Sequence, residues 1–321
     1  MLPNWLGDAV MALPALADIV RQEPGVVLDL AARPSIAPLV PLIPGAGRAV
    51  VLGPRSVSIE SIRRGAYDAA VLLPNSFASA WLVKAAGVPE RWGYRADARG
   101  WLLTRAVDPP SRVHQAAYYQ HLATTLGFAP GPLQPSLRVT DDLRAIGARV
   151  LEAAGWDGVG RLVAVAPGAA FGGAKRWPSD RFAGVIERLA HDNVRAVLVG
   201  ARADRAASRE VLASVHSGLR PIDLTGGTDL PELAAVLAHC RALVTNDSGA
   251  MHFAAALGVP VTAVFGPTIE GETRPLGTAR VAVVHGDVWC RPCMLRECPL
   301  THRCMTAVSV DDVLREVRVN G

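Results

Sequence analysis

Two hydrophobic periods alternate along this chain. Continuous apolar stretches rich in Val, Leu and Ala, such as 161–168 and 194–200, are typical of strands buried on both faces of a sheet. Between these stretches, apolar residues recur at helical spacing. One face of a helix predicted over 179–192 carries Phe182, Val185, Ile186 and Leu189. The alternation predicts right-handed βαβ units and parallel sheets.

The same patterns place the remaining elements. Strands are predicted at 26–32, 68–74, 242–246 and 260–266. Helices are predicted at 12–22, 76–87, 141–154, 228–240 and 249–258. We expect Gly87 to end its helix, and Ser179 and Thr228 to be the N-caps of theirs.

The chain is long enough for two domains. It has 321 residues, half of them hydrophobic. The stretch 128–139 is rich in Pro and Gly and has no period, so we expect the boundary there. The prediction is an N-terminal Rossmann-like domain over 1–140 and a second over 141–321, with a cleft between them. Ligands of such sheets bind at the carboxyl ends of the strands.

Composition narrows the class of protein. The net charge of +4 and the pI of about 9.0 permit an anionic partner without requiring one. No apolar run has the ~18 residues of a membrane span, and the first residues lack the basic region of a secretory signal. We therefore expect a cytoplasmic protein whose five cysteines are thiols or metal ligands.

The segment 245–268, TNDSGAMHFAAALGVPVTAVFGPT, predicts an anion site. A strand ends at Asn246 and a polar turn opens a helix, whose first N–H groups and dipole favour an anion. Ser248 adds a hydroxyl, Gly249 permits close approach, and His252 lies about one turn into the helix. Asp247 would repel a phosphate, so it is expected to bind a ribose hydroxyl or hold the turn. The alternative is ordinary N-capping with His252 in the core.

A second glycine-containing loop follows the strand at 161–168. In APGAAFGGAKRWPSDRF, residues 166–182, the chain leaves the strand through Gly168, and the pair beginning at Gly172 gives a loop. Lys175 then supplies a point charge suited to a pyrophosphate. The spacing is not that of a Walker loop. The alternative is a surface loop with a solvated Lys175.

Asp8 lies where the N-terminal segment, MLPNWLGDAVMALPALADIV, becomes helical. A carboxylate at a strand-to-helix turn that faces a cleft is a candidate general base. The alternative is an Asp in the first helical turn, stabilised by the dipole.

Four cysteines near the C-terminus have the spacing C-x2-C-x4-C-x5-C. They are Cys290, Cys293, Cys298 and Cys304. This spacing permits a structural zinc or iron–sulfur site, but it differs from the common zinc spacings. We expect a loop near the cleft with reduced thiols and no metal.

Five motifs, taken together, resemble a known family. NWLGDAVMALPAL, LLPNSFASAWLVKAAGVPERWGYR, PGAAFGGAKRWP, TNDSGAMHFAAALGVPVTAVFGPT and the cysteine segment occur in this order. They resemble the glycosyltransferase family 9 heptosyltransferases, most of all their heptosyltransferase II branch. The resemblance implies a GT-B fold of two Rossmann-like domains. It also implies inverting transfer of heptose from ADP-L-glycero-D-manno-heptose to the inner core of lipopolysaccharide.

The resemblance also implies roles for single residues. Asp8 matches the proposed catalytic base, and Lys175 matches the lysine that binds the donor phosphates. The nucleotide-binding turn is matched by Asp247, Ser248, Gly249 and His252. Asp204 is matched to an acidic residue that holds the ribose. The sequence has no Asp-x-Asp pair, so no divalent metal is expected on the pyrophosphate and no cofactor is expected.

The acceptor is expected on the N-terminal domain. Residues 91–112 interleave arginines with Trp and Tyr, a mixture that suits phosphorylated sugars. The candidate acceptor-binding residues are Asn75, Arg95 and His114. A solvated basic rim is the alternative; nucleic acid is not expected, because no nucleic-acid motif accompanies the charge. An anionic glycolipid acceptor implies peripheral contact with the inner membrane.

The N-terminus departs from the family pattern, in which an apolar strand precedes the PNWLGD turn. Here Met1 and Leu2 precede Pro3, so the first strand is expected to be missing or very short, and the natural protein is expected to start several residues earlier. Two further functions stay open. One is a family 9 transferase with another donor or acceptor, and the other is a nucleotide-binding protein with impaired catalysis.

Overall fold

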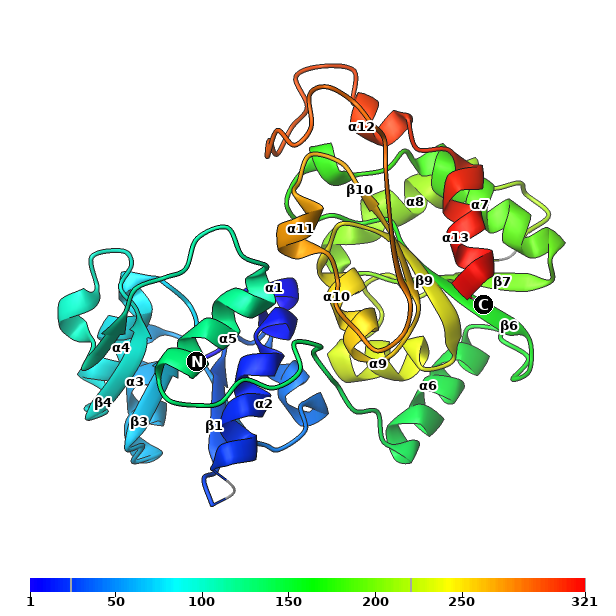
Figure 1. Cartoon of the computed structure of the whole chain (residues 1–321). Coiled ribbons are helices and arrows are strands. Elements are labelled where there is room, and N and C mark those ends of the chain that lie inside the picture. The colour runs from blue at the N-terminus through cyan, green and yellow to red at the C-terminus, as the bar shows by residue number, and fades with distance from the viewer. Residues whose placement is uncertain (24, 220, 321) are drawn as a thin grey trace. The chain divides into compact units, whose positions relative to one another are not determined.

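The computed structural model describes residues 1–23, 25–219 and 221–320. The chain divides into two compact units, unit 1 (Met1–Leu137) and unit 2 (Arg138–Gly321). Each unit contains parallel strands and helices (Figure 1). None of the helices in the described ranges is long and apolar enough to cross a membrane.

Unit 2 is built on one six-stranded sheet in the order β11-β10-β9-β6-β7-β8. Every neighbouring pair is parallel. The strands are β6 (Arg161–Ala166), β7 (Val194–Leu198), β8 (Ile222–Asp223), β9 (Cys240–Asn246), β10 (Val261–Phe265) and β11 (Val281–His285). The two predicted apolar stretches form β6 and β7, which are almost entirely buried. The prediction of a parallel sheet is therefore confirmed.

Helices connect these strands. They are α6 (Asp141–Ala153), α7 (Ser179–His191), α8 (Arg205–Ser214), α9 (Leu230–Leu237), α10 (Gly249–Ala256), α11 (Glu270–Thr273), α12 (Arg303–Thr306) and α13 (Val310–Asn320), with 3-10 turns η3 (Gly173–Lys175) and η4 (Arg202–Asp204). The predicted face of α7 is buried and packs with Val313 and Val317 of α13. The C-terminal helix therefore completes the core of unit 2.

Two predicted N-caps are wrong by one residue. Ser179 is the first helical residue of α7, and the extended Pro178 precedes it. α9 is capped by Asp229 rather than Thr228, because the Asp229 carboxylate accepts from Glu232 N at 2.8 Å and the Glu232 carboxylate accepts from Asp229 N at 3.0 Å. This reciprocal capping box satisfies two helix-end donors.

Unit 1 has two parallel sheets. β1 (Leu28–Ala32) pairs with β2 (Ala46–Val51), and a second sheet has the order β3-β4-β5. The second sheet comprises β3 (Ala69–Leu72), β4 (Glu90–Tyr94) and β5 (Arg105–Val107). The helices are α1 (Leu6–Met11), α2 (Leu13–Gln22), α3 (Arg55–Arg64), α4 (Phe77–Ala85) and α5 (Gln115–Thr125), with η1 (Ala37–Leu42) and η2 (Gly100–Leu102). As predicted, the chain leaves α4 at Gly87, which has a φ of +85°.

Met1 and Leu2 lie between the two sheets of unit 1. Leu2 N donates to Ala31 O at 2.8 Å, and Leu73 N donates to Met1 O at 3.3 Å. The Met1 amino group is buried and donates to Val71 O at 2.7 Å. Its burial lowers its pKa to about 5. These two residues take the place in which the sequence predicted a very short first strand.

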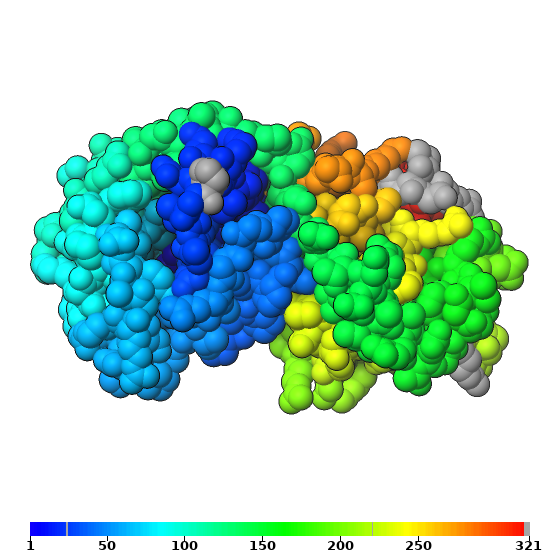
Figure 2. All heavy atoms as spheres, turned by 90° about the horizontal axis from the view of Figure 1, so that it is seen from below, coloured from blue at the N-terminus to red at the C-terminus, as the bar shows by residue number. Residues whose placement is uncertain are grey.

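The Pro- and Gly-rich segment after α5 is fastened to unit 1 through Asp18 of α2. Asp18 is buried, and its carboxylate accepts from Gly131 N and from Gln120 Nε2, both at 2.9 Å. In Figure 2 the blue atoms of α2 and the green atoms of α5 and the following segment lie on one face of the unit. The start of this segment is therefore held in place by hydrogen bonds.

Gly147 of α6 offers a test of how closely α6 packs on α9. A Cβ added at Gly147 would lie 2.5 Å from the backbone of Ala235. In an open helix position Gly→Ala stabilises by about 0.5–1 kcal/mol. Here we expect Gly147→Ala to destabilise unit 2 by about 1–3 kcal/mol, because the helices must separate. Urea unfolding measures this.

The control is Ala145→Gly at an exposed position of α6, which is expected to cost about 1 kcal/mol through helix propensity alone. A Gly147→Ala protein more stable than the wild type would show that α6 and α9 are not tightly packed.

Candidate functional site

The carboxyl edge of the unit 2 sheet brings together residues far apart in the sequence. β9 lies between β6 and β10, and β7 follows β6, so the loops after these strands are neighbours. Gly168 follows β6, Asp204 follows β7 and Asp247 follows β9. Three of the predicted nucleotide-binding segments therefore converge on one edge, where ligands of parallel sheets bind.

Asn246, the last residue of β9, ties two of these loops together. Its side chain is fully buried; Oδ1 accepts from Trp177 N at 2.9 Å, and Nδ2 donates to Pro167 O at 2.7 Å. Both ends of the 167–177 loop are thus fixed to the end of β9. Sequence reasoning used Asn246 only as the end of a strand, because nothing local indicates a partner about seventy residues away.

Asp247 is paired with Lys175. Lys175 Nζ lies 2.5 Å from Asp247 Oδ2, and Thr268 Oγ1 donates to the same oxygen at 2.5 Å. Asp247 and Thr268 are buried, and the Lys175 side chain is 12% exposed. Asp247, which by itself would repel a phosphate, therefore orients Lys175, the cation of the predicted anion site. Thr268 was not among the predicted site residues.

The Lys175 loop is also held by the cysteine segment. Arg296 O accepts from Ala174 N at 2.9 Å, and Glu297 Oε1 accepts from Gly173 N at 3.0 Å. Gly172 has a φ of +153°, and a Cβ there would collide with the Arg296 backbone. The glycines predicted to give a loop are thus required for close approach between two segments.

Two cations share the ring of Phe171. Lys175 Nζ lies 4.7 Å from the ring centroid, and the Arg296 guanidinium carbon lies 5.3 Å from it. Cations are attracted to aromatic faces. The ring thus gathers positive charge beside the carboxyl edge, which favours a bound anion; sequence reasoning did not identify Arg296.

The turn between β9 and α10 has the predicted form. Ser248 is the extended N-cap residue and Gly249 is the first residue of α10. The Ser248 side chain does not cap the helix; its hydroxyl lies 3.2 Å from that of Thr245. N-capping by Ser248 therefore does not account for this turn. His252 lies in the first turn of α10 and is 4% exposed. Its predicted contact with the nucleotide stays a prediction.

Asp204 lies against Gly168. Its carboxylate accepts from Ala201 N at 2.8 Å, and a Cβ added at Gly168 would overlap with it. Asp204, which follows β7, and Gly168, which follows β6, therefore lie next to each other at the carboxyl edge. The ribose contact predicted for Asp204 stays a prediction.

In unit 1, Asp8 lies in the first turn of α1 and is half-buried. Tyr119 of α5, itself 4% exposed, donates from its phenol oxygen to Asp8 Oδ1 at 3.3 Å. Burial, and then the charge of Asp8, raise the pKa of the Tyr119 phenol, so it stays a donor at every working pH. The hydrogen bond orients one oxygen of Asp8. Tyr119 could not be found from sequence, since the two residues are 111 positions apart.

The three acceptor candidates have different surroundings. Asn75 Nδ2 donates to the Tyr118 hydroxyl at 2.7 Å. Arg95 is exposed and forms an ion pair with Asp108 at 3.2 Å. His114 is the N-cap of α5, and its Nδ1 accepts from Ala116 N at 3.1 Å. The His114 side chain therefore stabilises the start of α5.

Arg99 organises the loop that carries Asn75. It is fully buried, and Nε donates to Tyr94 O at 3.0 Å while Nη1 donates to Ser79 Oγ at 3.0 Å and to Pro74 O. Burial lowers its pKa to about 10. A guanidinium held by neutral groups leaves the loop positively polarised. The sequence showed Arg99 only as one arginine among several.

The four C-terminal cysteines differ in exposure. Cys304 is buried at α12 and Cys293 is exposed. Burial, and then the thiols of Cys290, Cys298 and Cys293, raise the pKa of Cys304. Within the described ranges no three His, Cys, Asp or Glu side chains are arranged to hold a metal ion.

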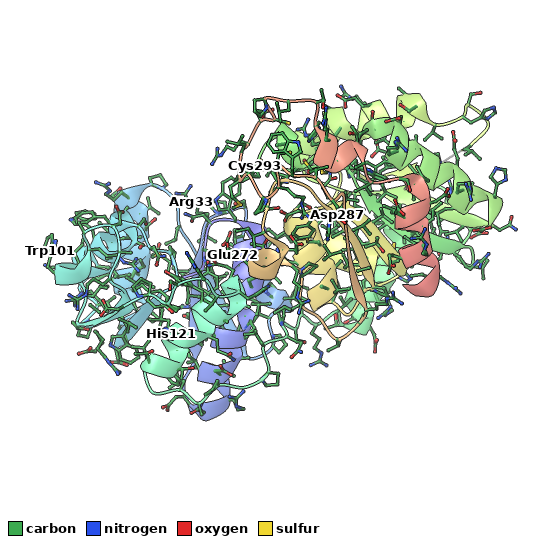
Figure 3. All side chains as sticks on the ribbon, turned by 45° about the horizontal axis from the view of Figure 1, so that its top comes forward. Arg33, Trp101, His121, Glu272, Asp287 and Cys293 are labelled. Atoms are coloured by element: carbon green, nitrogen blue, oxygen red, sulfur yellow. The ribbon has the colours of Figure 1, made fainter. Side chains whose placement is uncertain are left out.

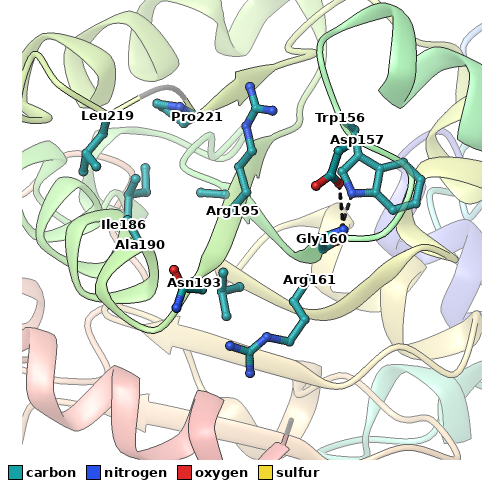
Figure 4. A pocket seen from close by; sticks show the side chains of 12 residues that line it. Trp156, Asp157, Gly160, Arg161, Ile186, Ala190, Asn193, Arg195, Leu219 and Pro221 are labelled. Carbon is teal, nitrogen blue, oxygen red and sulfur yellow. Dashed lines mark hydrogen bonds between the residues drawn. The ribbon is translucent and has the colours of Figure 1, made fainter.

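A separate pocket of about 380 Å³ lies at the opposite end of the unit 2 sheet (Figure 4). Its lining includes Trp156, Arg161 and Arg195, and the last two stand at the starts of β6 and β7. This is the amino-terminal edge of the strands, so the pocket is distinct from the candidate site.

Comparison with known proteins agrees with this arrangement. The sequence model of glycosyltransferase family 9 (heptosyltransferase) matches residues 56–303. Lipopolysaccharide heptosyltransferase 2 of Escherichia coli K12 is 32% identical over 294 residues, which are 85% of this chain and 84% of the relative. Lipopolysaccharide heptosyltransferase 1 of Pseudomonas aeruginosa is 28% identical over 321 residues, covering 91% and 84% of the two chains.

Solved structures give the same result. The structure of E. coli ADP-heptose lps heptosyltransferase II matches with a TM-score of 0.87 and 29% identity, over 99% of this chain and 96% of that one. E. coli heptosyltransferase WaaC with ADP matches with a TM-score of 0.75 and 20% identity, over 98% and 97%, and supports the fold. The predicted GT-B fold is confirmed.

The ion pair between Lys175 and Asp247 can be tested by its contribution to stability. Lys175→Met leaves a buried carboxylate with the Thr268 hydroxyl as its remaining partner among these contacts. We expect a loss of about 3 kcal/mol in the free energy of unfolding, measured by urea denaturation. The exposed Lys84, the only other lysine, is the control; Lys84→Met should change stability by less than about 0.5 kcal/mol. Equal, small effects of both substitutions would contradict the importance of this pair.

Proposed function

The chain belongs to glycosyltransferase family 9, and we propose that it transfers heptose from ADP-L-glycero-D-manno-heptose to the inner core of lipopolysaccharide. The observation that carries this proposal is the buried Lys175–Asp247–Thr268 cluster at the carboxyl edge of unit 2. It supplies a fixed cation beside a helix N-terminus in a protein similar to ADP-heptose lps heptosyltransferase II.

In this proposal the donor binds to unit 2. The Lys175 ammonium and the first amides of α10 hold the diphosphate, because both favour negative charge. Ser248 and Gly249 line the turn, and Asp204 accepts from a ribose hydroxyl. Asp247 holds Lys175 in place, so little reorganisation is needed when ADP departs as an anion.

Asp8 is the proposed general base. The acceptor hydroxyl oxygen attacks the anomeric carbon of the heptose while the bond from that carbon to the β-phosphate oxygen breaks. The hydroxyl proton passes to the Asp8 carboxylate, and the bonding electrons leave with ADP. The Tyr119 hydrogen bond orients one Asp8 oxygen, which helps to hold the carboxylate in a defined position for proton transfer.

The acceptor is an anionic glycolipid in this proposal. Asn75 is the first candidate for contact with this glycolipid, because Tyr118 and Arg99 hold its side chain in a defined position. We propose that the enzyme is cytoplasmic and meets this acceptor at the inner face of the inner membrane through peripheral contact.

Calorimetric titration with ADP tests the donor site. We expect the wild type to bind ADP more tightly than UDP or GDP. Lys175→Met should weaken ADP binding about 10- to 100-fold, since one charge-assisted contact to the phosphates is lost. Lys84→Met is the matched control and should bind normally. Equal ADP affinity of both variants would contradict the role of Lys175, and equal binding of all three nucleotides would favour a different donor.

Turnover of ADP-heptose with a lipopolysaccharide acceptor tests the base. Asp8→Asn is nearly isosteric and should lower kcat by about 10²–10⁴ while leaving ADP affinity unchanged. Tyr119→Phe removes the orienting hydrogen bond alone and should lower kcat about tenfold. The exposed Asp68→Asn serves as the control. Full activity of Asp8→Asn would rule out Asp8 as the base.

A further inference from the structure

Helix α4 of unit 1 is largely apolar, and one of its aromatic residues, Phe77, is exposed. Ser79, Ala80 and Val83 are buried against the unit. A second stripe consists of Phe77, Trp81 and Lys84, at the i, i+4 and i+7 spacing of one helix face. Phe77 and Lys84 are exposed, whereas Trp81 is partly buried against the core. A surface helix normally carries polar residues on its outer face. Core packing accounts for Trp81, but the exposed Phe77 needs another explanation.

Residues from two neighbouring elements extend the stripe. Trp101 of η2 is 68% exposed, and its ring centroid lies 6.1 Å from that of Phe77, which is 38% exposed. Figure 3 shows Trp101 at the outer edge of unit 1. On the other side, Arg55 of α3 lies over the ring of Trp81. We call the set of Arg55, Phe77, Trp81, Lys84 and Trp101 the aromatic–basic surface.

The two cations of this surface, Arg55 and Lys84, contact aromatic rings. Lys84 Nζ lies 4.7 Å from the Trp101 centroid, and the Arg55 guanidinium carbon lies 4.8 Å from that of Trp81. In the described part of the chain neither cation forms an ion pair with a carboxylate, whereas nearby Arg63 and Arg64 both pair with Glu60. The contact with a ring positions each cation without neutralising it.

We propose that the aromatic–basic surface docks unit 1 onto an anionic lipid bilayer. Trp rings favour the level of the lipid headgroups, and Lys and Arg beside them attract anionic headgroups. The aromatic side chains supply apolar contact, which a purely electrostatic anion site would not need. The surface adjoins the candidate acceptor loop, because α4 begins two residues after Asn75. Docking would bring that loop to the membrane.

The proposal gains its purpose from the proposed glycolipid acceptor, but its test uses neither acceptor nor donor turnover. Failure of vesicle binding and failure of heptose transfer are therefore distinguishable results.

Sedimentation of the full chain with lipid vesicles tests the docking. We expect binding to phosphatidylcholine vesicles that contain phosphatidylglycerol, weaker binding as salt rises, and weaker binding to vesicles of phosphatidylcholine alone. Trp101→Ser and Lys84→Gln should each weaken binding to the anionic vesicles about fivefold. Trp289→Ser is the matched control, since this Trp is 81% exposed in unit 2, and it should bind like the wild type. Unchanged urea unfolding of Lys84→Gln shows that unit 1 stays folded.

Absence of binding to the anionic vesicles would overturn the proposal. So would an equal loss in Trp289→Ser, because the effect would then follow from any exposed Trp. Binding of a single-stranded oligonucleotide that Trp101→Ser abolishes, without vesicle binding, would assign the surface to nucleic acid instead.

Discussion

Parallel strand pairing is the constraint on which unit 2 depends. Each strand must be followed by a return connection, so all strands end at the same edge. The central position of β9 between β6 and β10 makes its last residues the meeting point of that edge. Asn246 and Asp247 are buried there, and each reaches a loop from another strand. The site is therefore assembled by side chains that also hold the loops together.

Burial gives this assembly its strength and its sensitivity. A buried carboxylate is costly unless a cation and hydrogen-bond donors compensate it. Asp247 has both, in Lys175 and Thr268. The same arrangement keeps a lysine in a defined position before any ligand arrives. The cysteine segment adds two hydrogen bonds to the Lys175 loop, accepted by the Arg296 carbonyl and by the Glu297 side chain. The conformation of the loop therefore depends on two distant stretches of the chain.

In unit 1, different interactions hold the candidate residues in place. Its candidate base, the half-buried Asp8, accepts a hydrogen bond from a buried phenol, that of Tyr119. Arg99 uses several neutral acceptors to fix one loop, at the cost of a buried cation. Beyond that loop, the aromatic–basic surface leaves two cations without carboxylate partners among the described residues. Unit 1 thus combines a rigid loop with an exposed face that is chemically suited to a lipid surface.

The sequence by itself determined the elements and the chemistry within each loop. Apolar stretches and helical faces predicted β6, β7 and α7, because burial on one or two faces leaves a local period. Glycines and single charges identified Gly168, Lys175 and the turn at Ser248, because such turns need those residues locally. The tertiary structure alone decided that Lys175 meets Asp247, that Tyr119 meets Asp8, and that Thr268, Arg99 and Arg296 take part. These contacts join residues separated by tens of positions or more. Their geometry depends on strand order and helix packing, which the local sequence around either residue does not indicate.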